Sequence, residues 1–149
     1  LGAPDWTLKR GEITQKDVTP LRSFFSEPMQ HGRLFLAGDA AHIVPPTGAK
    51  GLNSAVADIN VLAAALINRV QKDDEELLRE YSGVALRRNW QVQRFSWSNT
   101  AMYHILPDSN SFTRRMQEAQ IEYLVTDETA QILYAQNHTG LPITHKPKF

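Results

Sequence analysis

The chain has 149 residues, a size that suits one domain or part of a larger one. Its 16 basic and 16 acidic residues cancel, so nothing in the charge favours nucleic acid as a partner or a disordered acidic tail. The absence of cysteine excludes disulfides, thiolate metal sites and cysteine nucleophiles, and it is compatible with a cytoplasmic location. No continuous apolar run reaches the ~18 residues of a membrane span. The first residues do not resemble a signal peptide, and the missing initiator methionine predicts that the chain begins inside a longer protein.

The first third of the chain predicts short strands. Residues 17–27 are expected to be extended, because Pro20 and Pro28 disfavour a helix there. A turn through residues 29–32 is followed by a nearly continuous apolar run at residues 33–38. Such a run is typical of a strand buried on both faces at the centre of an α/β sheet. Because two strands do not make a stable sheet, the other strands are expected from chain outside this sequence or from a partner.

The remainder predicts helices, so the expected fold class is α/β with a few strands followed by a mainly helical carboxyl-terminal region. From Gly51 the apolar period becomes helical, and the polar residues 68–74 are expected to end this first helix. A second helix is predicted from Glu75 to about Met102. A third is predicted at residues 112–124, capped by Asp108 or Ser109, and a fourth at residues 128–136, capped by Asp127. The predicted stripe of the first helix consists of Leu52, Ala55, Val56, Ile59, Leu62, Ala63, Leu66 and Ile67.

A glycine and a carboxylate stand where the apolar run 33–38 ends. Open α/β sheets bind ligands at the carboxyl ends of their strands. Gly38 would let a ligand approach the backbone closely, and Asp39 can accept hydrogen bonds from sugar or ribityl hydroxyls. The alternative is that Asp39 only caps a turn.

The next segment favours the ligand site. Residues 45–51 contain two prolines and two glycines and lead directly into the first helix. The first amides of a helix point outward without partners, with about half a positive charge of dipole behind them. Unpaired amides near Leu52 and Asn53 could stabilise the negative charge that develops at the N1 and O2 edge of a reduced flavin.

Residues 32–53 resemble a known family. Gly-Asp-Ala-Ala-His at residues 38–42 is similar to a motif of the flavoprotein aromatic hydroxylases. Its continuation, Ile-Val-Pro-Pro-Thr-Gly-Ala-Lys-Gly-Leu-Asn at residues 43–53, resembles the 4-hydroxybenzoate 3-monooxygenases more specifically. Shorter stretches agree, so that the resemblance spans roughly residues 17–142; they lie at residues 20–24, 27–32, 86–88, 94–97 and 140–142.

The resemblance implies part of an FAD-binding, Rossmann-like domain. Residues 1–53 would supply strands and the flavin-contacting loop, and residues 54–149 would form a helical region that helps to make a homodimer. The implied reaction uses FAD, NADPH and O2 to convert 4-hydroxybenzoate, a small aromatic substrate, to 3,4-dihydroxybenzoate and water.

The same resemblance assigns cofactor contacts. Asp39, beside Gly38, would bind the ribityl chain of FAD. The backbones of Leu52 and Asn53, preceded by Gly51, would contact the pyrimidine edge of the flavin.

The resemblance also assigns residues to the substrate and to NADPH. Pro46 would offer its carbonyl to the substrate hydroxyl, and Thr47 and Ala49 would line the pocket near the ring. Lys50 would add positive charge near the flavin. Arg22 matches an arginine that serves NADPH in that family.

The sequence departs from the family pattern in three ways. It contains neither the adenine-binding Gly-x-Gly-x-x-Gly pattern nor the segment that grips the substrate carboxylate, which predicts that this chain cannot hydroxylate anything alone. Where the family carries a tyrosine of the proton relay, alignment on residues 140–142 places His138. A histidine can relay protons with a pKa nearer neutrality, but His138 could equally be a surface residue.

Other residues admit competing interpretations. His42 could be a base, but a packing or hydrogen-bonding role is favoured. The aromatic residues Trp90, Phe95, Trp97 and Tyr103 could form a binding platform, although core or subunit packing is favoured. No histidine spacing indicates a metal site. Two rival functions stay open: a related hydroxylase acting on another phenol, and a non-catalytic helical interaction module with a degenerate flavin loop.

Overall fold

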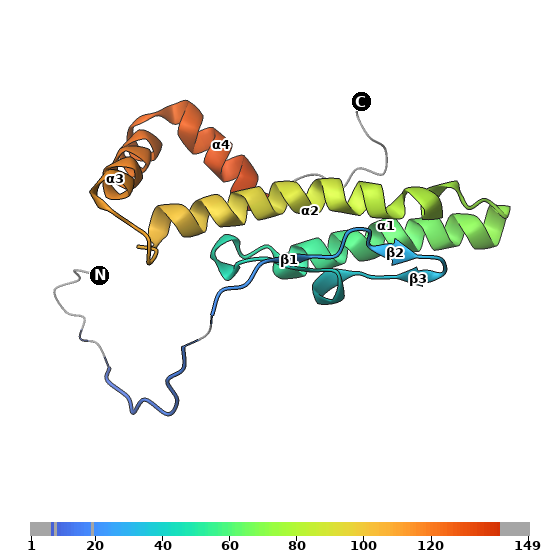
Figure 1. Ribbon diagram of the computed structural model, residues 1–149, viewed down its shortest axis with the longest axis horizontal. Coiled ribbons are helices and arrows are strands. Elements are labelled where there is room, and N and C mark those ends of the chain that lie inside the picture. Colours follow the sequence, from blue (N-terminus) through green and yellow to red (C-terminus); the bar gives the residue numbers. More distant parts are fainter. Residues whose placement is uncertain (1–6, 8, 19, 141–149) are drawn as a thin grey trace.

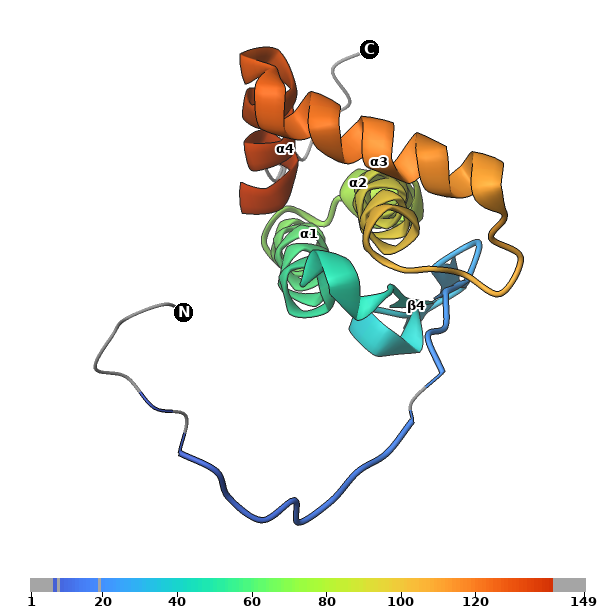
Figure 2. The ribbon, with the colours of Figure 1, turned by 90° about the vertical axis from the view of Figure 1, so that its left-hand side faces the viewer.

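A computed structural model describes residue 7, residues 9–18 and residues 20–140. Two long helices, α1 (Gly51–Lys72) and α2 (Glu76–Tyr103), lie antiparallel and side by side (Figures 1 and 2). Two further helices, α3 (Ser111–Thr126) and α4 (Glu128–Thr139), lie at the carboxyl end of α2. Residues 141 and 142, the end of the family resemblance, lie outside the described residues.

The predicted central strand is replaced by short antiparallel pairs. Strand β1 (Phe24–Phe25) pairs with β4 (His42–Ile43), and β2 (Gln30–His31) pairs with β3 (Leu34–Phe35). The expectation of a strand buried on both faces is therefore wrong for the described residues, and Leu34 is 61% exposed. In this apolar run, Phe35 and Leu36 pack against the core on one side. Among the described residues, β3 is bordered by a single strand, β2.

The hairpin is held on the helices by a small core. Met29 and Tyr81 are fully buried in this core, and Tyr81 Oη donates a hydrogen bond to the carbonyl of Leu36 (2.7 Å). The other buried members of the cluster are Ala41, Val61 and Ala85. The strands thus lie against the α1–α2 pair, which forms the scaffold.

Helix α1 begins at Gly51 as predicted, but its buried face is not the predicted apolar stripe. Small and polar side chains form its buried face, namely Ser54, Ala57, Asp58, Val61 and Ala65. Much of the predicted apolar stripe is exposed, including Leu52, Val56, Ile59, Leu66 and Ile67. By length and composition α1 could also cross a membrane, although core helices of globular proteins meet the same criterion.

The N-cap residues of α3 and α4 can be compared with the predicted ones. Asp127 caps α4 as predicted, since its carboxylate accepts from the amide of Ala130 (2.8 Å). The prediction that Asp108 or Ser109 caps α3 is wrong. Asn110 stands immediately before the helix and forms a capping box with Thr113, in which each side chain accepts from the other residue's amide.

The loop before α1 is seated on α2. It contains a 3-10 turn, η2 (Pro46–Gly48), which contacts α2. The hydroxyl of Thr47 donates to the carbonyl of Ser96 (3.1 Å) and lies 2.5 Å from the hydroxyl of Thr100. Gly48 is buried against Ser96, and this close approach leaves no room for a side chain.

Gly48→Ala should lower the free energy of unfolding by about 1–3 kcal/mol, as overpacked sites do. Its Cβ would lie 2.3 Å from Oγ and 3.2 Å from Cα of Ser96, so α2 or the loop would have to move. Chemical denaturation followed by circular dichroism measures the change. Gly83→Ala is the matched control, because no atom lies within 4 Å of its Cβ position on α2. This control should gain up to about 1 kcal/mol, and an undiminished stability of Gly48→Ala would contradict the close approach.

Candidate functional site

The turn that carries Asp39 lies against the first turns of α1. It is a 3-10 turn, η1 (Gly38–Ala40), which contacts α1. Gly38 is buried with a left-handed φ of +60°, and a Cβ there would lie 3.1 Å from Cβ of Ala55. Asp39 is exposed, so its carboxylate is available to a ligand. The turn that carries the predicted carboxylate therefore packs on the helix whose start was predicted at Gly51.

A buried carboxylate of α1 joins three segments behind this turn. Oδ2 of Asp58 accepts from the amide of Gly38 (3.0 Å) and lies 2.6 Å from Nε2 of His42. Oδ1 of Asp58 accepts from Nδ2 of Asn89 on α2 (2.9 Å). Because an ionised carboxylate only accepts hydrogen bonds, Nε2 of His42 is the donor. His42 also stacks on Phe25 and is 1% exposed, which fits the favoured packing role.

The amino end of α1 is open. Lys50 occupies the N-cap position without a side-chain capping bond, and the first intrahelical bond links the amide of Ser54 to the carbonyl of Lys50. Apart from its own chain neighbours and the adjacent backbone of α1, no heavy atom lies within 4 Å of the Cβ position of Gly51. Leu52 and Asn53, the predicted flavin contacts, are exposed in this first turn. The helix start therefore has the uncapped amides and the free space that an anionic ring edge requires.

The approach to the helix bends at Ala49, which adopts a left-handed conformation (φ 49°, ψ 40°). Ala49 and Pro46 are both exposed. The carbonyl of Pro46, predicted to meet the substrate hydroxyl, accepts from the amide of Ala49 (2.9 Å). A carbonyl oxygen has two lone pairs, so it keeps the capacity for a second hydrogen bond. The hydroxyl of Thr47 is instead used to hold the loop on α2.

Lys50 and His138, 88 residues apart, are brought together beside this loop. The side chain of Lys50 is 4% exposed, and its ammonium group donates to the backbone carbonyl of His138. The ammonium also lies 5.5 Å from the ring centroid of Phe95, a cation–π distance. The ring of His138 stacks on Tyr134, with centroids 5.9 Å apart.

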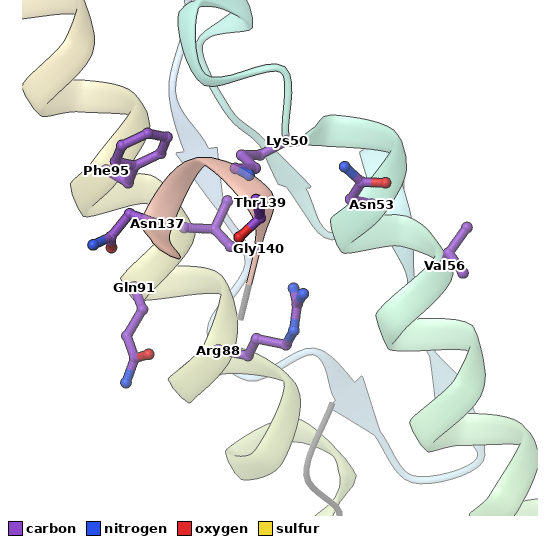
Figure 3. A pocket seen from close by; sticks show the side chains of 10 residues that line it. Lys50, Asn53, Val56, Arg88, Gln91, Phe95, Asn137, Thr139 and Gly140 are labelled. Carbon is purple, nitrogen blue, oxygen red and sulfur yellow. The ribbon is translucent and has the colours of Figure 1, made fainter. Parts of the chain in front are cut away.

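A pocket of about 390 Å³ lies next to Lys50, between α1, α2 and the end of α4. Figure 3 shows Lys50 and Arg88 approaching the end of α4 from different elements. The pocket is also lined by Asn53, Val56, Gln91, Val92, Phe95, Asn137, Thr139 and Gly140. Burial lowers the pKa of Lys50, and the positive charge of Arg88 lowers it further. The guanidinium of Arg88 is thus close enough to the ammonium of Lys50 to lower its pKa.

Not every predicted site residue is part of this arrangement. Arg22 is exposed on the segment before β1. Of the aromatic set, only Phe95 is buried, while Trp90 is half exposed and stacks on Phe25 with centroids 4.5 Å apart. In the described ranges, no group of three or more histidines and carboxylates could hold a metal ion.

Sequence reasoning missed Asp58, Asn89 and Arg88. The available signal was a carboxylate inside the run Ser54, Ala57, Asp58 and Val61, whose three- and four-residue spacing puts it on one helix face. A carboxylate on a buried face needs hydrogen-bonding partners. Those partners come from residues 20 positions before and 31 positions after it, which no local pattern identifies.

The sequence profile of the FAD binding domain family matches residues 3–96. This chain belongs to the FAD binding domain family. It is 44% identical over 135 residues to the p-hydroxybenzoate hydroxylase of Acinetobacter baylyi, covering 91% of this chain and 33% of that protein. It is 31% identical over 112 residues to the 3-amino-4-hydroxybenzoate 2-monooxygenase of Streptomyces cremeus, covering 74% of this chain and 27% of that protein.

A solved structure supports the family relationship. The p-nitrophenol 4-monooxygenase of Pseudomonas putida is similar to this chain with a TM-score of 0.61 and 26% identity. The match covers 83% of this chain and 32% of that structure. This family member thus spans about a third of the length of the relatives that it matches.

The lowered pKa of Lys50 predicts a pH dependence of stability. The unfolded chain, with a lysine pKa near 10.5, binds the proton more tightly than the folded protein does. The free energy of unfolding that Lys50 contributes should therefore rise as the pH increases from the folded-state pKa toward 10.5. Lys50→Met should remove this rise. Denaturation of both proteins at several pH values between 8 and about 10.5 measures it.

The control for this experiment is Lys72→Met, which removes an exposed lysine from the other end of α1. Its stability should follow that of the wild type across the series. A constant difference between wild type and Lys50→Met at every pH would contradict the role assigned to the buried ammonium.

Proposed function

We propose that this chain supplies the isoalloxazine side of the FAD site in a monooxygenase that hydroxylates 4-hydroxybenzoate to 3,4-dihydroxybenzoate. The observation that carries the proposal is that the Asp39 turn packs on Ala55 and Asp58 of α1, the helix whose amino end is uncapped. The 44% identity to a p-hydroxybenzoate hydroxylase favours this substrate among those of the family. In the balanced reaction, the substrate, O2, NADPH and one proton give the hydroxylated product, water and NADP⁺.

The residues at the helix start fit a flavin. FAD, once bound, supplies the electron transfer and the reaction with O2. The carboxylate of Asp39 would accept hydrogen bonds from ribityl hydroxyls, and Gly38 keeps the turn close to α1. The amides of Leu52 and Asn53 would face the pyrimidine edge, with Gly51 leaving space for the ring. The helix dipole favours negative charge at that edge.

On the substrate side, the second lone pair of the Pro46 carbonyl would accept from the phenolic hydroxyl. Thr47 and Ala49 would shape the wall beside the ring, with the Thr47 hydroxyl fixing the loop to α2. Lys50, whose ammonium lies over the Phe95 ring and donates to the carbonyl of His138, would add positive charge near the flavin. Its low exposure would strengthen that effect, because charges act more strongly away from water.

Several parts of the proposal concern the whole protein. Arg22 would serve NADPH, the helical region would contribute to a homodimer, and the enzyme would be cytoplasmic. Residues 1–53 would belong to the FAD-binding domain and residues 54–149 to the helical region. A related hydroxylase acting on another phenol is the alternative, favoured by the match to a 3-amino-4-hydroxybenzoate 2-monooxygenase.

The intact protein, supplied with FAD, NADPH and 4-hydroxybenzoate, should consume O2 and release 3,4-dihydroxybenzoate. This chain alone should give no product, because it lacks a dinucleotide-binding glycine motif. Product chromatography with a panel of phenols measures both. Preference for another phenol would support the alternative substrate. Absence of FAD binding in a fluorescence titration of the intact protein would refute the proposed function and leave the helical interaction module.

His138→Tyr in the intact enzyme tests the proton relay. The substitution exchanges an imidazole for a phenol, which holds its proton more tightly. The limb of the pH–rate profile that depends on the relay should therefore move to higher pH by about one unit or more. His31→Tyr, an exposed change in β2, is the control and should leave the profile in place. An unchanged profile for His138→Tyr would assign His138 to the surface.

A further inference from the structure

We infer that Asp58 is a positioning residue for the cofactor, acting through the backbone amide of Gly38 to fix where the Asp39 carboxylate meets FAD. This inference rests on the proposed function. Asp58 itself is 2% exposed, so it does not reach a ligand. Asp58 would affect FAD binding only by holding the η1 turn in place.

The contact with Gly38 fixes the turn from inside. Oδ2 of Asp58 accepts from the Gly38 amide at 3.0 Å, and Gly38 directly precedes Asp39. Gly38 also approaches Ala55, three residues before Asp58 on α1, so the turn is held at adjacent points of one helix face. The same helix offers its open first turn to the flavin. Asp58 thus sets the position of Asp39 relative to the amides of that turn.

The carboxylate is itself held from two other sides. His42 fixes Oδ2 from β4 at 2.6 Å, and Asn89 fixes Oδ1 from α2 at 2.9 Å. A side chain with three donors around it has little freedom to rotate, so Gly38 meets an acceptor in a defined place. Neither His42 nor Asn89 reaches the exposed face, since both are 1% exposed.

A role of Asp58 in stability alone predicts a different effect on FAD binding from a role in positioning Asp39. If Asp58 only stabilised the core, its substitution would lower stability and leave the contribution of Asp39 to FAD binding unchanged. If Asp58 positions Asp39, the two residues form one unit, and the effects of their substitutions on FAD affinity are not additive.

The test is a double-mutant cycle in the intact protein, with FAD dissociation constants measured by fluorescence titration. The variants are Asp58→Ala, Asp39→Asn and the pair, each at a temperature where circular dichroism shows the apoprotein folded. Each single variant should weaken FAD binding about tenfold, as expected for a lost hydrogen bond to a charged group. The double variant should be within about twofold of Asp39→Asn.

Asp58→Asn replaces Asp58→Ala if the alanine variant does not fold. It keeps the side-chain volume but leaves one acceptor oxygen, so binding should weaken about threefold, again without additivity. Ser82→Ala is the matched control, because Ser82 Oγ also accepts from a buried backbone amide, that of Met29 (2.9 Å), away from the turn. Its FAD affinity should stay within about twofold of wild type.

Additive effects in the cycle, or unchanged FAD affinity in a folded Asp58 variant, would overturn this inference and leave the proposed function standing. A wild-type protein that does not bind FAD would instead refute the proposed function.

Discussion

One buried carboxylate holds the strand-and-turn segment on the helices. Asp58 receives hydrogen bonds from the amide of Gly38 in η1, from His42 in β4 and from Asn89 in α2. Each hydrogen bond to a charged group contributes about 1.5–3 kcal/mol, whereas a buried carboxylate without partners is strongly unfavourable. Removing any one of the three donors would therefore make the burial of this carboxylate less favourable. These hydrogen bonds fix residues 38–42 on the α1–α2 pair more firmly than two-residue strands could.

The other half of the site depends on α2. Thr47 bonds to the carbonyl of Ser96, and Gly48 lies so close to the same residue that η2 cannot slide along the helix. The η1 turn is seated on α1 and the η2 turn on α2, so the packing of these two helices sets the distance between the two turns. Lys50 then ties the end of α4 to this frame through the carbonyl of His138. A site made of loops thus takes its geometry from two long helices.

The sequence predicted what is encoded locally. Helical periodicity and capping residues together predicted the four helices of the described residues to within a few positions, and Asp127 was correctly predicted to cap the fourth. The strand at residues 33–38 was not predictable, since the same apolar residues serve a buried central strand or a hairpin packed on one side. The hydrogen-bond partners of Asp58 could not be predicted from the sequence for a different reason. A hydrogen bond between residues 58 and 89 depends on how two helices face each other, which no short window contains. The family motif located the turn and the helix start, but not the carboxylate beneath them.

The two faces of α1 link the fold to the chemistry proposed for it. Its small and polar residues are buried in this chain, and its larger apolar residues, such as Ile59 and Ile67, are exposed. An apolar stripe along a helix is a surface that packs against something. Relatives in this family are about three times as long as this chain, so under the proposed function the rest of the flavoprotein would cover that stripe. Covering it would remove water from around the first turn of α1. The partial charge of uncapped amides acts more strongly where the dielectric constant is low, and so the packing that completes the fold would also strengthen the site that receives the flavin.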